Sequence, residues 1–514
     1  MLWVRALDSP NARMLPGTQD ADLPFWSPDN RSVGFFAQGK LKTIELSGGS
    51  PQMLASAANR RGATWGPNGL IVFSPVGGSS LFSVNAAGGP VAPFTRLNTA
   101  RQELGHSYPY FLPDGRHYLY QMISSDDRVA GLYTGTIGTS EIKRIASTRS
   151  RAEYSNGFLI FGRDGNVVAQ PFDLERLVVS GEPVRVGENL GISFGELGNY
   201  AFSVSSAGTL TYWGGSYMPR TQVTIVDANG RVVARPGEPG EHYGVAVSPD
   251  QTRVALEQRD PKANSVDVWV MELATGIRSR FTSSPSYDWT GSPVWAADGA
   301  GILFTAFKNE FEVKGLRGAD VDRIPLEPGF ARGGWPMVWS PDGQYVVIVQ
   351  NDPDSGWDLW TLPTRGDRKP VPYLKTPYEE RQPDISPDSH WIAYSSDESG
   401  RREIYIDSFP RAGNKVRVST NGGLRPRWTR DGRDLYYLTN DGVLFAARIA
   451  FSQSVPLVTD TRRLFQAPRI DLLLSRSQFA VLGNGERFLF NAFVDDPKPQ
   501  GLTVVTNWRA AIAR

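Results

Sequence analysis

The chain of 514 residues contains no cysteine, and this absence excludes disulfide bonds, thiolate metal sites and a cysteine nucleophile. It has only four histidines, His106, His117, His242 and His390, and no two of them have the close spacing of a zinc-binding pair. The sequence also lacks the run of about 20 apolar residues that a membrane-spanning helix needs. Its N-terminus, with Arg5 and Asp8, lacks the apolar segment typical of a signal peptide.

Positive and negative charges are nearly balanced, with 54 Lys and Arg against 53 Asp and Glu. No long run of one sign occurs, so we do not expect nucleic acid to be a partner. Helical periodicity is not sustained over ten residues anywhere. The 53 glycines and 37 prolines instead favour many short strands joined by turns, and the hydrophobic content of 40% is sufficient to form buried cores.

A turn signature of the form Ser-Pro-Asp-Gly recurs roughly every 45 residues, a period typical of an array of one supersecondary unit. Clear copies occur at 26–30, 65–69, 111–115, 247–251, 295–299, 339–343, 385–389 and 428–432, with weaker ones at 204–208 and 481–485. The gap between the third copy and 204–208 contains Asn156-Gly157 before an apolar segment, which we count as one more. The sequence therefore predicts eleven repeats.

Residues 335–374 indicate the structure of one repeat. The turn Ser340–Gly343 is followed by a β-branched and aromatic strand at 345–349, an alternating strand at 357–362 and a further strand at 371–374. With the apolar segment before the turn, this makes four antiparallel strands. Such units arranged radially form a β-propeller, which explains the order of strands better than a solenoid does.

Eleven blades are too many for one ordinary propeller, so we expect an all-β protein of two tandem propellers. We place the first at 1–217, with five to six blades, and the second at 218–514, with six. Two hairpins without a turn signature indicate ring closure by N-terminal strands. Residues 221–236 are expected to join 477–508, and residues 1–20 are expected to join 200–213.

Several segments resemble the propeller region that follows the kinase domain in certain large bacterial serine/threonine protein kinases. They are 2–30, 39–52, FLPDGRHYLYQ (111–121), GNVVAQPFD (165–173), RPRWTRDGRDLYYLT (425–439) and LTVVTNW (502–508). More broadly, the blades resemble the TolB-like, WD-repeat-like propeller superfamily. The kinase motifs HRD, DFG and VAIK are absent, so the resemblance implies a sensing or docking role without kinase activity. The chain as given is expected in the cytoplasm, or in the periplasm if it belongs to a membrane kinase.

The start of each innermost strand, near the mouth of a propeller channel, is the expected binding position, because binding concentrates where a rigid scaffold can vary. The candidate binding residues are His106, Tyr108, Tyr243, Trp335, Arg381 and Arg425. We expect a protein or peptide as the partner, with a small ligand in the channel as the alternative. No catalytic residue, metal ligand or cofactor is expected.

Three other interpretations apply to the same repeats. A TolB-like scaffold that docks envelope proteins is one alternative, and a hydrolase of the lactonase or glycosidase type in the propeller channel is another. A following serine hydrolase domain is not expected, because the repeats run almost to Arg514. We expect a structural role for the turn aspartates and packing between blades for the tryptophans before the turns. The arginines at 425–433 are expected to form a solvated rim, and the acidic loops at 126–127, 352–354 and 397–398 are expected to be solvated hairpin loops.

Overall fold

The structure is a computed structural model, and it describes residues 1–57, 60–75, 78–124, 126–188, 190–191, 199–214, 220–260, 265–283, 290–306, 310–318, 320–326, 334–352, 355–452, 455–472, 476–494 and 501–512. Within these residues the protein is all-β, as the sequence predicts. The only helices there are three short 3-10 helices, η1 (Pro67–Gly69), η2 (Thr99–Arg101) and η3 (Trp508–Ala511). None of the helices in these ranges is long and apolar enough to cross a membrane.

The chain divides into two compact units, Met1–Met218 with Lys498–Arg514, and Pro219–Pro497. In the described part of the first unit, the innermost strands of five antiparallel sheets contact one another in sequence order. From inner to outer strand, the sheets are β3 (Asp22–Trp26), β4 (Ser32–Ala37), β5 (Lys40–Glu45), β6 (Gln52–Ser56); β7 (Ala63–Trp65), β8 (Leu70–Phe73), β9 (Phe82–Asn85), β10 (Ala92–Pro93); β11 (Glu103–Phe111), β12 (His117–Ser124), β13 (Gly131–Thr136), β14 (Ile142–Ala146); β15 (Ala152–Ser155), β16 (Phe158–Arg163), β17 (Asn166–Asp173) with both β18 (Val178–Val179) and β19 (Val184–Gly187); and β20 (Phe202–Val204), β21 (Leu210–Trp213), β46 (Leu502–Val505).

In the residues that the structure describes, the second unit is a six-bladed propeller whose innermost strands, β24, β28, β32, β36, β40 and β44, contact one another in a closed cycle. From inner to outer strand, its sheets are β24 (His242–Val247), β25 (Arg253–Asp260), β26 (Ser265–Glu272), β27 (Arg278–Arg280); β28 (Gly291–Trp295), β29 (Gly301–Ala306), β30 (Glu310–Gly315), β31 (Val321–Pro325); β32 (Gly334–Trp339), β33 (Tyr345–Asp352), β34 (Gly356–Pro363), β35 (Val371–Leu374); β36 (Glu380–Ile385), β37 (Trp391–Ser396), β38 (Glu403–Ser408), β39 (Val416–Arg417); β40 (Leu424–Trp428), β41 (Asp434–Leu438), β42 (Val443–Ser452), β43 (Val455–Gln466); and β44 (Phe479–Leu482), β45 (Arg487–Phe493), β22 (Thr221–Asp227), β23 (Val232–Ala234).

The recurring turn has the same hydrogen-bonding pattern in five blades. The hydroxyl of Ser340 donates to Asp342 Oδ1 (2.5 Å) and accepts from the backbone N–H of Tyr345 (2.9 Å), while Asp342 Oδ1 also accepts from the N–H of Gln344 (3.0 Å). Equivalent bonds occur at Ser27 with Asp29, Ser248 with Asp250, Ser386 with Asp388, and Thr429 with Asp431. The turn aspartates are therefore structural, because their side chains hold the reversal between the first two strands.

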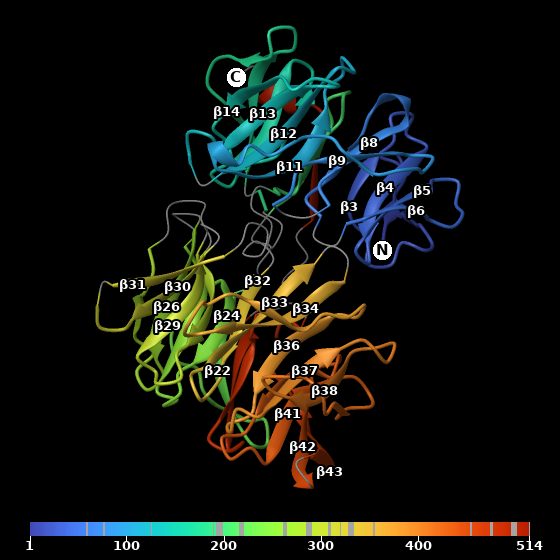
Figure 1. The fold of residues 1–514 in the computed structure, drawn as a ribbon. Helices are drawn as coiled ribbons and strands as arrows, with labels where there is room; N and C mark the ends of the chain where they lie inside the picture. The colour runs from blue at the N-terminus through green and yellow to red at the C-terminus, as the bar shows by residue number, and fades with distance from the viewer. Residues whose placement is uncertain are drawn as a thin grey trace. The chain divides into compact units, whose positions relative to one another are not determined.

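Ring closure of the second unit is confirmed. Strand β22 pairs with β45 along its whole length, from Thr221 opposite Phe493 to Asp227 opposite Arg487. In Figure 1 the green β22 accordingly lies beside a red strand from near the end of the chain. Alternate side chains of the two strands enter separate buried clusters, Val223 and Ile225 on one face and Val226 on the other. Both faces of this composite blade are thus buried against its neighbours.

The predicted closure of the first unit is wrong. Strands β1 (Trp3–Val4) and β2 (Arg13–Met14) form a two-stranded sheet of their own, and Leu2 and Val4 pack against the core of the β3–β6 sheet. The strand that pairs with β21 is β46, with Leu210 opposite Val505. Burial of Trp508 against Phe158, with ring centroids 5.4 Å apart, fixes this C-terminal segment. Residues 498–514 therefore belong to the first unit, and the predicted second propeller, 218–514, extended too far.

The tryptophans before the turns do not all behave as predicted. Trp295 and Trp428 are buried in clusters that combine two neighbouring blades, as expected. Trp26 is instead 52% exposed. The signature therefore fixes the backbone of each turn, but the packing of the preceding side chain depends on the adjacent sheet.

Candidate functional site

The innermost strands share an irregularity that the sequence does not reveal. In β11, β28, β36 and β40 the register to the second strand shifts at a β-bulge. A residue other than glycine adopts a left-handed conformation at each bulge, namely Tyr108, Ser292, Gln382 and Arg425, with φ between 51° and 57°. Bulges redirect side chains near binding and catalytic sites, and such backbone strain persists only where the surroundings enforce it.

All six innermost strands of the second propeller line one cavity of about 430 Å³, which we call the channel cavity. Its walls combine polar and apolar surface, and the apolar side chains include Pro336, Met337, Ile385 and Phe479. The charged residues that line it are Glu257, Asp384, Arg427, Arg430 and Arg476. A concave volume of roughly 300 to 1,000 Å³ is typical of ligand sites in proteins.

One side of this cavity continues into a stack in which two indole rings lie between two guanidinium groups. The indole rings of Trp335 and Trp357 are stacked, with centroids 4.8 Å apart and planes inclined by 28°. The guanidinium of Arg476, which also lines the channel cavity, lies 4.3 Å from the Trp335 ring centroid. The guanidinium of Arg381 lies 4.5 Å from the Trp357 ring centroid. We call these four residues the mouth stack, because Trp335 and Arg381 come from the starts of inner strands β32 and β36.

Buried carboxylates hold several of these groups in place. Glu257 is fully buried; its Oε1 lies 3.4 Å from Arg476 Nε, and its Oε2 accepts a hydrogen bond from the N–H of Ser292 (3.1 Å). Asp384 Oδ2 accepts a hydrogen bond from the N–H of Trp428 (2.8 Å). Burial raises the pKa of Asp384 to about 6, although the guanidinium of Arg427 acts in the opposite direction. The pKa of the Asp384 carboxyl group in the channel cavity is therefore raised to about 6.

The predicted binding residues of the second propeller have different surroundings. Trp335 and Arg381 meet in the mouth stack through Trp357. Arg425 is 1% exposed and donates from its Nη atoms to the backbone carbonyls of Arg476 and Asp471, so it fixes the segment that carries Arg476. The expectation that Arg425 and Arg427 form a solvated rim is therefore wrong; burial lowers the pKa of both guanidinium groups.

Tyr243, His106 and Tyr108 are buried. The carbonyl of Tyr243 accepts a hydrogen bond from Gln478 Nε2 (2.6 Å), which ties the first blade of the second propeller to the last. In the first unit, His106 Nδ1 is hydrogen-bonded to Thr95 Oγ1 (2.8 Å), and the His106 ring meets the ring of Tyr120 edge to face. His106 is only 2% exposed and Tyr108 only 6%. These three side chains are therefore placed to support their blades.

Sequence reasoning missed Trp357, Arg476, Glu257, Asp384 and Arg427. Trp357 follows the loop between the second and third strands of its blade, a position that the repeat alone assigns to packing. Arg476 precedes the weakest repeat copy, and Asp384 and Arg427 lie just beyond the bulges of their strands. A periodic pattern cannot locate a bulge, so it cannot say which side chain turns inward after it.

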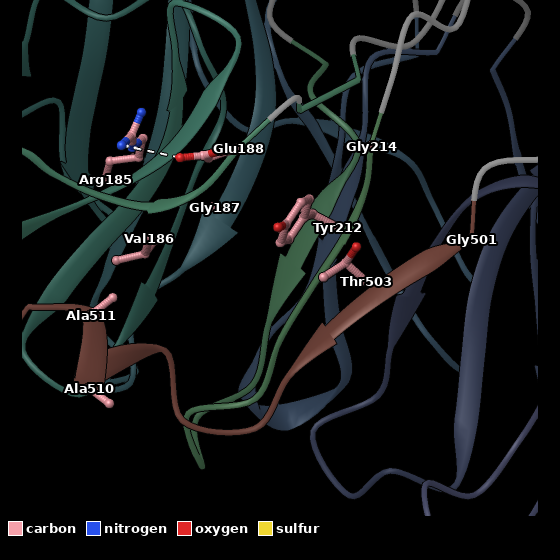
Figure 2. Close-up of a pocket in the computed structure, with 10 residues that line it drawn as sticks. All are labelled: Arg185, Val186, Gly187, Glu188, Tyr212, Gly214, Gly501, Thr503, Ala510 and Ala511. Atoms are coloured by element: carbon pink, nitrogen blue, oxygen red, sulfur yellow. Dashed lines mark ion pairs between the residues drawn. The ribbon is translucent and has the colours of Figure 1, made fainter.

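A second cavity, of about 900 Å³, lies in the first unit and is lined by residues of β19, β21, β46 and η3 (Figure 2). Its two charged residues, Arg185 and Glu188, pair with each other at 3.1 Å, and both side chains are 61% exposed. Figure 2 shows Tyr212 and Thr503 on the opposite wall. Because no innermost strand lines this cavity and its two charged residues are already paired at the surface, we place the candidate site in the second propeller.

The acidic loops pair with basic side chains where the structure describes them. Asp352 Oδ2 lies 2.6 Å from Lys375 Nζ, Glu398 Oε2 lies 2.6 Å from Lys415 Nζ, and Asp126 pairs with Arg128. Asp354 lies outside the described residues. Across the described ranges, no group of three or more His, Cys, Asp and Glu side chains could hold a metal ion.

Comparison with known proteins gives structural likeness only. No family model matches the chain, and no curated protein matches it. A protein described as TolB from Agrobacterium tumefaciens is 15% identical with a TM-score of 0.40, over 54% of this chain and 99% of that one. TolB from Acinetobacter baumannii is 16% identical with a TM-score of 0.35, over 61% and 80%. The tricorn protease is 12% identical with a TM-score of 0.33, over 88% and 62%. These are β-propeller proteins, and the four-stranded sheets of the present chain, closed into a cycle in its second unit, make it a β-propeller protein as well.

Proposed function

We propose that this protein is a non-catalytic β-propeller scaffold that binds a protein or peptide partner at the channel mouth of its second propeller. The observation that carries this proposal is the mouth stack, which continues into the channel cavity through Arg476. Tryptophan and arginine are the residues most enriched at the energetic centres of protein interfaces. A stacked and cation-bound pair of indoles is also rigid, so little side-chain entropy is lost when a partner contacts it.

Two settings suit this binding role. The sequence resemblance to the propeller half of bacterial receptor-type kinases suggests a sensory or docking module, and the TolB-like resemblance suggests a scaffold that docks envelope proteins. In both settings the partner is held by the propeller and not chemically changed. A kinase gene adjoining that of the protein would favour the first setting, whereas neighbouring envelope-protein genes would favour the second.

The alternative of a channel hydrolase draws on Glu257 and Asp384, two carboxyl groups that line one cavity. Glycosidases use such a pair, with one group protonated and the other ionised. Here Glu257 is held by Arg476 and by the backbone of Ser292, and Asp384 is bonded to the backbone of Trp428. These bonds favour a positioning role for both carboxyl groups. Hydrolysis of chromogenic glycosides or lactones that Asp384→Asn abolishes would contradict the non-catalytic proposal.

The test is a pull-down from extract of the source cells with the full chain as bait. Trp335→Leu and Trp357→Leu should each remove the partners that the native chain retains, because each breaks the mouth stack while keeping an apolar side chain. Trp26→Leu is the matched control, because this tryptophan is 52% exposed in the first unit. The proposal fails if both stack variants, with unchanged melting temperatures, retain the same partners as the native chain.

A further inference from the structure

The channel cavity holds more cationic than anionic groups. Three guanidinium groups line it, those of Arg427, Arg430 and Arg476, against two carboxyl groups. Glu257 is already satisfied by Arg476 and by the N–H of Ser292. Neighbouring charges inside a cavity with low-dielectric walls act more strongly than in water. An excess positive charge is therefore presented to whatever enters the channel.

Hydrogen-bond donors are also present on the cavity wall. Ser292 is 6% exposed and lines the cavity, and its hydroxyl has no hydrogen-bond partner among the residues that the structure describes. Arg427 donates to the carbonyl of Pro426 (2.7 Å) and to Ser477 Oγ (2.9 Å), which uses two of the five N–H donors of a guanidinium. A buried hydroxyl without a partner costs free energy, and a ligand acceptor would remove that cost.

We propose that the channel cavity of the second propeller receives a carboxylate of its ligand, held by Arg427 and Ser292, so that the preferred partner is an acidic peptide segment. This inference rests on the proposed binding function and specifies its ligand chemistry. Arginine binds carboxylates with paired, charge-assisted hydrogen bonds, which are stronger than neutral ones. The volume of about 430 Å³ suits one or two side chains of an extended segment, while the mouth stack contacts the adjacent part of the chain.

The titration of Asp384 agrees with this arrangement. Burial raises the pKa of its carboxyl group to about 6, with Arg427 opposing the shift. Glu257, Arg430 and Arg476 are the other charged residues that line the cavity. Below pH 6 the neutral form of Asp384 no longer repels an entering carboxylate. Acidic ligands should therefore bind more tightly at pH 5.5 than at pH 7.5.

The test uses the full chain and two pools of pentapeptides, acetylated and amidated at their ends, that differ only in a central Glu or Gln. A third pool has the central Gln and a free carboxyl terminus. Immobilised protein is equilibrated with each pool, and the retained peptides are quantified by mass spectrometry. We expect the Glu pool to be retained at least tenfold more strongly than the blocked Gln pool. Retention of the third pool alone would assign the site to a chain terminus instead of an acidic side chain, and it would still support a carboxylate site.

Variants separate this inference from the proposed function. Arg427→Gln should abolish the preference for Glu, and Ser292→Ala should reduce it several-fold; the second variant keeps the test valid if the first does not fold. Arg433→Gln is the matched control, because its side chain is 73% exposed just beyond the same turn. Equal retention of all pools that depends on Trp335 would overturn the carboxylate site and leave the binding scaffold intact. Retention of no pool would overturn the carboxylate site as well.

Discussion

Replacement of Asp384 by Asn should stabilise the second propeller at neutral pH. Burial raises the pKa of this carboxyl group from 3.8 to about 6, so the folded state binds its proton more tightly than the unfolded state does. The stability that this proton provides is complete below the unfolded pKa, and it is lost as the pH rises through the folded pKa. A rise of about two pKa units corresponds to about 3 kcal/mol, at 1.4 kcal/mol per unit. This is an upper bound, because Asp384 retains some contact with solvent.

Asn mimics the protonated side chain, and its oxygen can still accept the hydrogen bond from the N–H of Trp428. Asp384→Asn should therefore match the native chain at pH 4 and exceed it in free energy of unfolding at pH 7.5, by up to about 3 kcal/mol. The measurement is scanning calorimetry between pH 4 and pH 7.5, with Asp367→Asn as the control because Asp367 lies exposed in a turn. Identical pH dependence in the native chain and in Asp384→Asn would refute the reasoning.

Three further outcomes are expected. Trp508→Ala should lower the free energy of unfolding of the first unit by about 3–5 kcal/mol, since it empties a fully buried site. Trp3→Ala, at a 62% exposed position, is the control. An unchanged calorimetric transition in Trp508→Ala would contradict the assignment of residues 498–514 to the first unit. The hydrogen bond from Ser248 lowers the pKa of Asp250 to about 2, so the contribution of this turn to stability should be present above pH 4 and lost as the pH falls towards 2. In thermal scans at decreasing pH, Asp250→Ala should not show this loss of stability. A loss that persists in the variant would disprove the role of Asp250. Affinity for acidic peptides should rise as the pH falls from 7.5 to 5.5 in isothermal titration, and Asp384→Asn should remove this dependence; an unchanged slope in the variant would rule out Asp384 as its source.

The sequence could predict the blades because their information is local. Ser340, Asp342 and the β-branched residues after them specify a turn and a strand without any distant partner, and the strand predicted at 371–374 is β35. The partner of β46 could not be predicted. The sequence of its four residues, Leu502–Val505, is compatible with the outer strand of any blade. Its pairing with β21 depends on which sheet has an unpaired edge once the other strands have formed. Long-range pairing of this kind is decided by tertiary packing.

The candidate site was only half predictable for the same reason. Trp335 and Arg381 follow from the repeat, because they begin inner strands. Trp357 lies on the third strand of the blade that carries Trp335, and it meets Arg381 of the next blade. Arg476 joins the mouth stack from the segment before the last inner strand. The bulge that turns Arg425 back towards the backbone of Asp471 and Arg476 leaves no trace in the pattern of apolar residues.

The pairing of β46 with β21 makes the second propeller an insertion within a single sheet of the first. Two adjacent hydrogen-bonded strands, Leu210–Trp213 and Leu502–Val505, are separated in the chain by the entire second unit. During synthesis the edge of β21 therefore stays unpaired until the second unit has left the ribosome. Residues 220–494, in contrast, contain all the strands that the structure describes in the second propeller, in one continuous stretch. A fragment of those residues should fold alone, and the first unit should need a peptide of residues 501–512 to complete it.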